Sequence, residues 1–139
     1  MHPFAAPKTL SPDLARARAY WEGLLRGAAT MPFWDDFKPS DLGDLESEAF
    51  TLEVFDKPER FRVGMVGPAL KARLGVELEG AFLGEGELPE PFGFLLSQAS
   101  ATVESGEPSL YRGEAGERLL LPMWGEGRIG LILGVIAQA

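Results

Sequence analysis

Few residues in this sequence could do nucleophilic, acid–base or metal chemistry. The chain has no cysteine, and its one histidine is His2, at a terminus that we expect to be exposed. The absence of cysteine excludes disulfides, thiolate nucleophiles, zinc-thiolate sites and the cysteinyl adduct of flavin photosensors. His2 alone gives little basis for histidine catalysis or a His-ligated haem. We therefore expect neither of these cofactors, and no motif indicates another.

Three glycines, Gly125, Gly127 and Gly130, have the G-x-G-x-x-G spacing of dinucleotide-binding loops. In such a loop the glycines open a helix whose N-terminus faces the pyrophosphate. Here a run typical of a β-strand follows the glycines at once, at residues 128–137. The glycines therefore predict a turn between two strands rather than a cofactor site.

The acidic residues form neither a catalytic pair nor a calcium loop. Asp35 and Asp36 are adjacent, so on an extended backbone their side chains point apart and cannot act as an acid–base pair. Asp41, Asp44 and Glu46 lack the spacing of a calcium loop, and the sequence has no P-loop, HExxH or G-x-S-x-G motif. We therefore expect no catalytic residue, no metal site and no enzymatic activity.

The charge balance also limits the partners that the chain can have. The net charge is −8 at pH 7, whereas a nucleic-acid partner needs a basic patch to neutralise its phosphates. The longest apolar run, 129–137, is far below the ~20 residues of a membrane span. Prolines interrupt the region where a signal peptide would be apolar. We expect a cytoplasmic protein that contacts neither nucleic acid nor membrane, with a flexible arm at 1–10 and a single domain at 11–139.

The first expected element is an amphipathic helix at residues 12–26. Ser11 can cap this helix, and Pro12 suits its first turn. An apolar stripe runs along it, formed by Leu14, Ala17, Trp21, Leu24 and Leu25. A stripe of this kind must be covered, either by the sheet of the same chain or by a second chain.

Strands and two further helices follow in the sequence. Alternating apolar residues predict strands at 49–55 and 61–66, and the turn residues between them predict an antiparallel hairpin. Gly67-Pro68 ends the second strand and opens a short helix, for which Gly75 suits a left-handed end. The remaining expected elements are a long helix and three strands, at residues 91–105, 109–113, 118–124 and 128–137.

The stretch from Phe61 to Gly80 is similar to the signature of the PAS domain family, as found in small single-domain bacterial PAS proteins. The signature reads G-x-x-[ILV]-x-x-x-x-G-x-x-[ILV]-x-G, and its positions are filled here by Gly67, Leu70, Gly75, Leu78 and Gly80. The segments 103–108 (VESGEP) and 121–123 (LPM) also resemble family segments. The chain departs from the family at 33–36, where aromatic and acidic residues replace an arginine, and at Pro68, where the family commonly has threonine.

This resemblance implies an α+β fold with a five-stranded antiparallel sheet in the order 2-1-5-4-3 and helices that cross it. In that topology the last strand lies in the middle of the sheet. The run 128–137 fits this place, because it is apolar throughout and must be covered on both faces. Pro122 cannot donate a ladder hydrogen bond, so we expect a bulge or an unpaired position there.

The resemblance also implies a non-catalytic sensory or regulatory role, with output through a separate protein partner. A small, largely apolar ligand would lie between the sheet and the crossing helices. The alternative is that the same residues simply fill a packed core. The positions that map to this pocket are Val63, Met65, Leu70, Leu74, Phe92, Leu96, Ala99, Met123 and Leu133.

A second interpretation of the function needs no ligand. The chain would then be a constitutive dimerisation or protein-interaction module, with a symmetric homodimer formed through the N-terminal helices. Leu14, Trp21 and Leu25 are the residues expected at that interface. The two interpretations differ in whether the denatured protein releases a stoichiometric small molecule.

Overall fold

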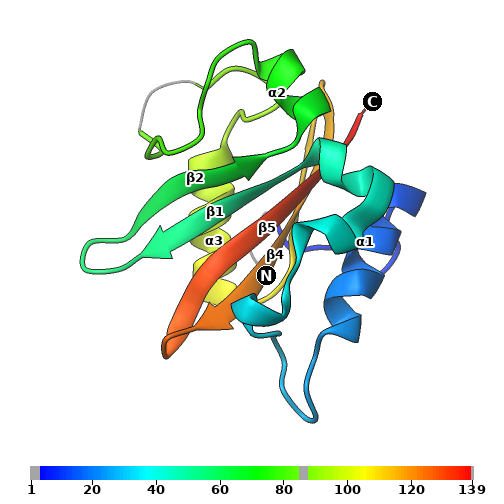
Figure 1. The fold of residues 1–139 in the computed structure, drawn as a ribbon, viewed down its shortest axis with the longest axis vertical. Coiled ribbons are helices and arrows are strands. Elements are labelled where there is room, and N and C mark those ends of the chain that lie inside the picture. The colour runs from blue at the N-terminus through cyan, green and yellow to red at the C-terminus, as the bar shows by residue number, and fades with distance from the viewer. Residues whose placement is uncertain (1–3, 85–87, 139) are drawn as a thin grey trace.

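The computed structural model describes residues 4–84 and 88–138 (Figure 1). Five strands form one antiparallel sheet with the order β2-β1-β5-β4-β3. The α+β class and the strand order expected from the sequence are therefore confirmed. The strands are β1 (Ala49–Phe55), β2 (Arg60–Val66), β3 (Ser109–Gly113), β4 (Gly116–Gly125) and β5 (Arg128–Gln138).

Helical segments cover the two faces of the sheet (Figure 1). The α1 face carries α1 (Pro12–Gly23) and the 3-10 segment η2 (Pro39–Glu48), with the short η1 (Trp34–Asp36) beside them. The α3 face carries α2 (Pro68–Leu74) and α3 (Leu95–Ser105). None of the described helices is both long and apolar enough to cross a membrane.

Strand β5 lies in the middle of the sheet, as its apolar sequence predicts. It pairs with β1 on one side and with β4 on the other. Two consecutive residues of β5, Ile132 and Leu133, are both fully buried. Ile132 packs in the cluster of the α3 face and Leu133 in the cluster of the α1 face. Burial on both faces is the reason that this strand has no polar side.

The G-x-G-x-x-G glycines lie in a β-hairpin. The two residues between β4 and β5, Glu126 and Gly127, have φ angles of 55° and 80°. Two positive φ values in a two-residue connection are typical of a type I′ hairpin turn, and a glycine relieves the strain of one of them. The expected turn is confirmed, and no helix N-terminus follows these glycines.

Helix α2 ends as expected and α1 ends early. Gly75 caps α2 with a φ of 71°, the left-handed conformation that glycine adopts without strain. The N-terminal helix was expected to reach residue 26, but it ends at Gly23. The N–H groups of Leu24 and Leu25 donate to carbonyls only three positions earlier, so the chain tightens and leaves the α-helical path.

Helix α3 begins four residues later than expected. Phe94 has a φ of 59° and stands immediately before its first residue, Leu95. The carbonyl oxygens of Pro91 and Gly93 accept hydrogen bonds from the buried Arg118, at 2.7 and 2.8 Å. The segment before α3 is therefore a loop held by a side chain of β4, and Pro91 is not the first residue of the helix.

Short extended segments cover both edges of the sheet. The carbonyl of Phe4 accepts a hydrogen bond from the N–H of Leu110, so the described part of the N-terminal arm lies along β3. Residues 1–3, which include His2, lie outside the described residues. At the other edge, the segment 80–83 pairs with β2 through bonds such as the one from Val63 N–H to the Ala81 carbonyl. Covered edges do not offer a free strand for pairing with another chain.

Candidate functional site

The nine residues expected to line one pocket lie on both faces of the sheet. Three of them, Met65, Met123 and Leu133, pack in the cluster of the α1 face. The backbone of the sheet separates this cluster from the other, so the nine residues cannot line a single pocket, and the expectation is corrected on this point. The six that pack in the cluster of the α3 face are Val63, Leu70, Leu74, Phe92, Leu96 and Ala99.

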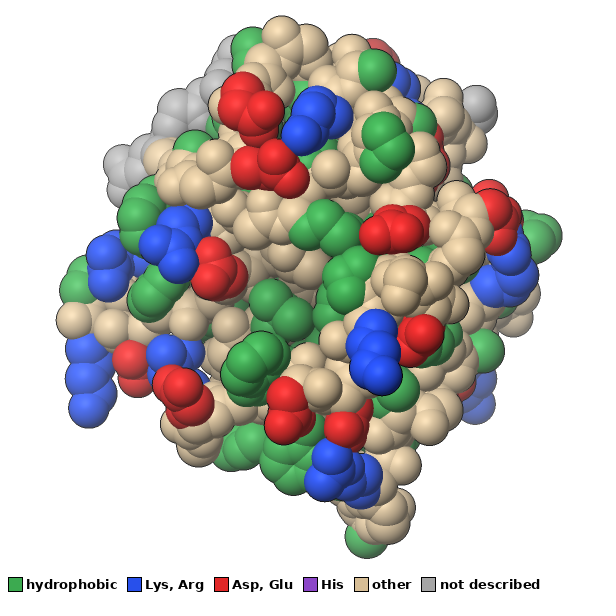
Figure 2. All heavy atoms as spheres, in the orientation of Figure 1, with side chains coloured by type: hydrophobic (Ala, Val, Ile, Leu, Met, Phe, Trp, Pro, Cys, Tyr) green, Lys and Arg blue, Asp and Glu red, His purple; other side chains and the backbone are tan. Residues whose placement is uncertain are grey.

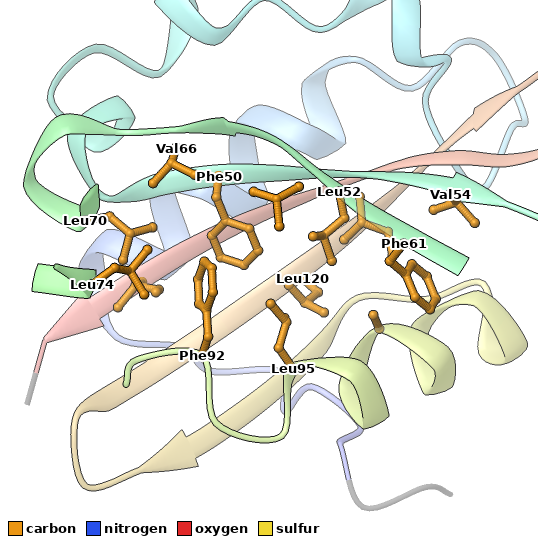
Figure 3. Close-up of a cluster of buried hydrophobic side chains, with 14 of the residues drawn as sticks. Phe50, Leu52, Val54, Phe61, Val66, Leu70, Leu74, Phe92, Leu95 and Leu120 are labelled. Carbon is orange, nitrogen blue, oxygen red and sulfur yellow. The ribbon is translucent and has the colours of Figure 1, made fainter. Parts of the chain in front are cut away.

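Side chains fill the space between the sheet and the helices of the α3 face (Figure 3). Phe50 from β1 points down from the sheet, and Phe92 points up from the loop before α3. Their ring centroids lie 4.7 Å apart, and neither ring is exposed. Leu70 and Leu95 pack around them and are equally buried. Packing of this density favours a core over a ligand site.

Two of the three residues expected at a dimer interface are buried inside their own chain. Leu14 is 0% exposed and Trp21 is 4% exposed, and both pack in the cluster of the α1 face. The third residue, Leu25, lies beyond the end of α1 and is half-buried. The sheet of the same chain thus covers the apolar stripe of α1. Leu14 and Trp21 are therefore covered by their own chain and not available to a second one, and the expected interface is corrected at these two residues.

Exposed aromatic residues gather at the end of β4, beside the part of the sheet that α1 leaves open. Phe33, Trp34 and Trp124 are 37%, 48% and 39% exposed. A parallel bridge between Phe33 and Trp124, and a 2.8 Å bond from Trp124 N–H to the Pro32 carbonyl, fix the loop to the strand. Figure 2 shows hydrophobic side chains across the middle of this face, with charged side chains around them.

Trp34 forms one wall of a hollow on the open part of the α1 face, which we call the sheet-face hollow. Its volume is about 240 Å³. The indole of Trp34 lies so close to Gly125 that a Cβ at this glycine would overlap the ring. The other lining residues that matter for its chemistry are Glu53, Phe55, Glu126, Arg128 and Leu131. Only a glycine at position 125 leaves room for this placement of the indole.

Two carboxylates and one guanidinium line the sheet-face hollow. Arg62 donates from Nε and Nη2 to the two oxygens of Glu53, at 2.7 and 3.1 Å. These bonds lower the pKa of Glu53, so this carboxylate is ionised at neutral pH. The guanidinium of Arg128 is bound to the backbone, because its Nη1 donates to the carbonyl of Val54 at 2.6 Å. Its Nε also lies 3.6 Å from Asp56.

A stack of rings and guanidinium groups stands beside the hollow, formed by the β1–β2 hairpin and the segment 80–83 that pairs with β2. The rings of Phe55 and Phe82 have their centroids 5.7 Å apart. The guanidinium of Arg60 lies 5.2 Å from one centroid and 5.3 Å from the other, and Arg62 adds a similar contact to each ring. Such cation–π contacts hold otherwise mobile side chains in place.

The lining of the sheet-face hollow has the character of a recognition surface. Within residues 4–84 and 88–138, no three acidic or histidine side chains are placed to hold a metal ion. The hollow offers an aromatic wall, an apolar surface at Leu131, two carboxylates and the guanidinium of Arg128. Aromatic residues with fixed polar groups around them are typical of interfaces with other molecules.

The sequence drew attention to the loop at 33–36 but did not predict the sheet-face hollow that this loop helps to form. The residues at 33–36 stood out because they depart from the PAS pattern, and their aromatic character is the signal that the sequence offered. The contact between Trp34 and Gly125 joins residues far apart in the chain, so no local pattern predicts it.

Comparison of the chain with protein-family models, with curated proteins and with solved structures finds no match. The interpretation of the function therefore depends on the residues of this chain and on their geometry.

Proposed function

We propose that this chain is a non-catalytic, PAS-like regulatory module that acts by binding a separate protein, with the sheet-face hollow inside the interface. Trp34 is the observation that carries this proposal. Its ring is 48% exposed, yet the backbone pairing of the loop and the contact with Gly125 hold it in one place. Tryptophan is enriched among the residues that dominate binding energy, and a ring that is already fixed loses little entropy on binding.

The fold and the interior support the same proposal. The strand order 2-1-5-4-3 is the one that the PAS resemblance implies. The packed α3 face supports a module that binds its partner without a ligand. We place the protein in the cytoplasm, because a chain without cysteine forms no disulfides and does not need an oxidising compartment for its stability.

A ligand-responsive sensor is the second candidate, supported by the PAS-like topology alone. A ligand on the α3 face would have to displace Phe92 or its neighbours from the cluster. Mass spectrometry of the purified protein, native and then denatured, tests this candidate. Release of a stoichiometric small molecule supports the sensor, and its absence supports the constitutive module.

Photo-crosslinking tests the proposed interface. Trp34 is replaced by p-benzoylphenylalanine in the organism that makes the protein, and cross-linked proteins are identified by mass spectrometry. The control places the same group at Val76, an apolar residue of similar exposure (50%) just after α2. We expect one protein to be cross-linked from position 34 and not from position 76. Equal cross-linking from both positions, or none from position 34, would contradict the proposal.

A further inference from the structure

We propose that the partner places a lysine or arginine side chain of an extended segment into the sheet-face hollow, against the indole of Trp34 and beside the carboxylates of Glu53 and Glu126. This inference rests on the proposed function, because it assigns the chemistry of the partner at the same surface. Its three supports are the fixed indole, the charge of the lining and the size of the hollow.

The indole of Trp34 is a ready cation-binding face. Tryptophan binds a cation over its ring more strongly than the other aromatic side chains do. The neighbouring rings already hold cations of this chain: Arg26 lies 5.0 Å from the centroid of Phe33, and Arg60 lies 5.2 Å from that of Phe55. Among the cation–π contacts of the described residues, none uses Trp34. A basic side chain from a partner would complete the pattern.

The charges around the hollow favour a positive guest. The guanidinium of Arg128 is already bound to the Val54 carbonyl and lies near Asp56. The carboxylate of Glu53 accepts two bonds from Arg62, and a carboxylate can accept about four. None of the ion pairs described for residues 4–84 and 88–138 includes Glu126. The net charge of −8 attracts a basic partner and repels a second copy of this chain.

The size of the hollow fits one side chain better than a free ligand. Its volume is about 240 Å³, and it is open to solvent. Pockets for drug-sized molecules are larger, about 300–1,000 Å³, and enclose most of the ligand. A long basic side chain can lay its methylene groups on Leu131 and Phe55 while its charged end reaches the carboxylates. The rest of an extended segment would lie across the open part of the sheet.

Peptide titrations followed by NMR test this inference. The probe is acetyl-Gly-Leu-Arg-Leu-Gly-amide, and the indole N–H resonance of Trp34 is identified by its loss in Trp34→Leu. We expect a saturable shift at peptide concentrations up to about 10 mM, and binding about tenfold weaker when glutamine replaces the arginine. A peptide with glutamate in that place should not bind, and added salt should weaken the arginine peptide.

Matched protein variants complete the test. Glu126→Gln should weaken the arginine peptide about threefold and leave the glutamine peptide unchanged. Glu104→Gln removes the same charge from the exposed side of α3, beneath the other face of the sheet, and should change neither. The amide spectrum of each variant shows whether it is folded. The inference is overturned if the arginine peptide gives no saturable shift, if the glutamine or glutamate peptide binds equally well, or if Glu104→Gln has the effect of Glu126→Gln.

The failure of this inference is distinguishable from failure of the proposed function. If position 34 cross-links one protein but the peptides show no preference for arginine, the interface stands and its assigned chemistry is wrong. If the cross-linked segment has an acidic or purely apolar residue at the contact, the inference is likewise overturned. If position 34 cross-links nothing, the proposed function itself fails.

Discussion

The indole Nε1 of Trp21 donates a hydrogen bond of 2.8 Å to the carbonyl oxygen of Pro122, which lies 101 positions later in the chain. The bond joins the last turn of α1 to β4. Pro122 stands beyond Leu120, the last β4 residue that pairs with β3, so its missing N–H falls where β3 needs no donor. Its carbonyl is satisfied by Trp21 instead. The indole of Trp21 thus takes the place of β3 as hydrogen-bond partner of β4 at Pro122.

Trp21→Phe should destabilise the protein by about 1–3 kcal/mol, because the Pro122 carbonyl loses its donor in a buried place. Trp21→Ala also leaves a cavity, and we expect a loss of about 3–5 kcal/mol. Denaturant unfolding measures both values. The control Trp124→Phe changes an exposed tryptophan and should cost less than about 0.5 kcal/mol. A strong dependence of the Trp21→Phe midpoint on protein concentration would instead indicate a dimer through α1.

Gly134→Ala should destabilise the protein by about 1–3 kcal/mol through overpacking, since its new methyl group would overlap the ring of Phe50. The control is Gly130→Ala in the same strand, whose Cβ would meet its nearest atom, the Gly125 carbonyl, at an ordinary 3.5 Å. We expect a change within about 0.5 kcal/mol there. When Phe50→Leu is combined with Gly134→Ala, the smaller side chain should recover part of the lost unfolding free energy. If the losses of the two single variants simply add in a double-mutant cycle, the contact between position 134 and the Phe50 ring is contradicted.

The pH dependence of stability should reveal the bond between Glu53 and Arg62. Arg62 lowers the pKa of Glu53, so the pair stabilises the protein above the unfolded pKa of this carboxyl and is lost as pH falls through the folded pKa. Both side chains are half exposed, so we expect a contribution of no more than about 0.5–1 kcal/mol.

The measurement is the difference in unfolding free energy between the natural chain and Glu53→Gln. It should be positive at neutral pH and fall towards zero as the pH decreases through the folded pKa of Glu53, below which both chains carry a neutral side chain at this position. Glu104→Gln is the matched control and should show no such trend. A difference for Glu53→Gln that stays constant across this range would mean that the ion pair adds nothing to stability.

The strands were accessible from their apolar alternation, and the fully apolar run of β5 indicated a central strand, whereas the full strand order came from the resemblance to PAS domains. The faces of single residues were not accessible. Between Phe50 and Leu52 the register with β2 shifts, and one extra residue enters β2. Met65 consequently leaves the face that Val63 occupies, and its N–H donates to the hydroxyl of Thr51 at 2.9 Å. A bulge of this kind reverses every face assignment beyond it.

Met123 and Leu133 were misplaced for a different reason. Both belong to strands that are buried on two sides, and an apolar residue carries no mark of which helix layer it faces. The start of α3 was misplaced because Pro91 suits a first helical turn locally, whereas Arg118, far away in sequence, binds the carbonyls of the loop. Tertiary contacts therefore decided the details that local patterns left open.

Arg118 is a buried cation whose hydrogen bonds go to neutral oxygens. It is 1% exposed, and burial lowers its pKa to about 10. Its Nε donates to Gln98 Oε1 at 2.7 Å, while its other nitrogens bind the carbonyls of Pro91 and Gly93. The guanidinium also lies 4.7 Å from the ring centroid of Tyr111.

Arg118→Met keeps the length of the side chain but leaves those three oxygens without this donor, so we expect a loss of about 3 kcal/mol or more. Arg118→Lys keeps the charge yet cannot bridge the three acceptors, and we expect a loss of about 2 kcal/mol. Arg112→Met, at an exposed arginine of β3, is the control and should cost less than about 1 kcal/mol. Hydrogen exchange should also speed up at Leu95 and Gln98, at the start of α3, in Arg118→Met but not in Arg112→Met. Unchanged exchange there would show that the loop before α3 does not depend on Arg118 for its conformation.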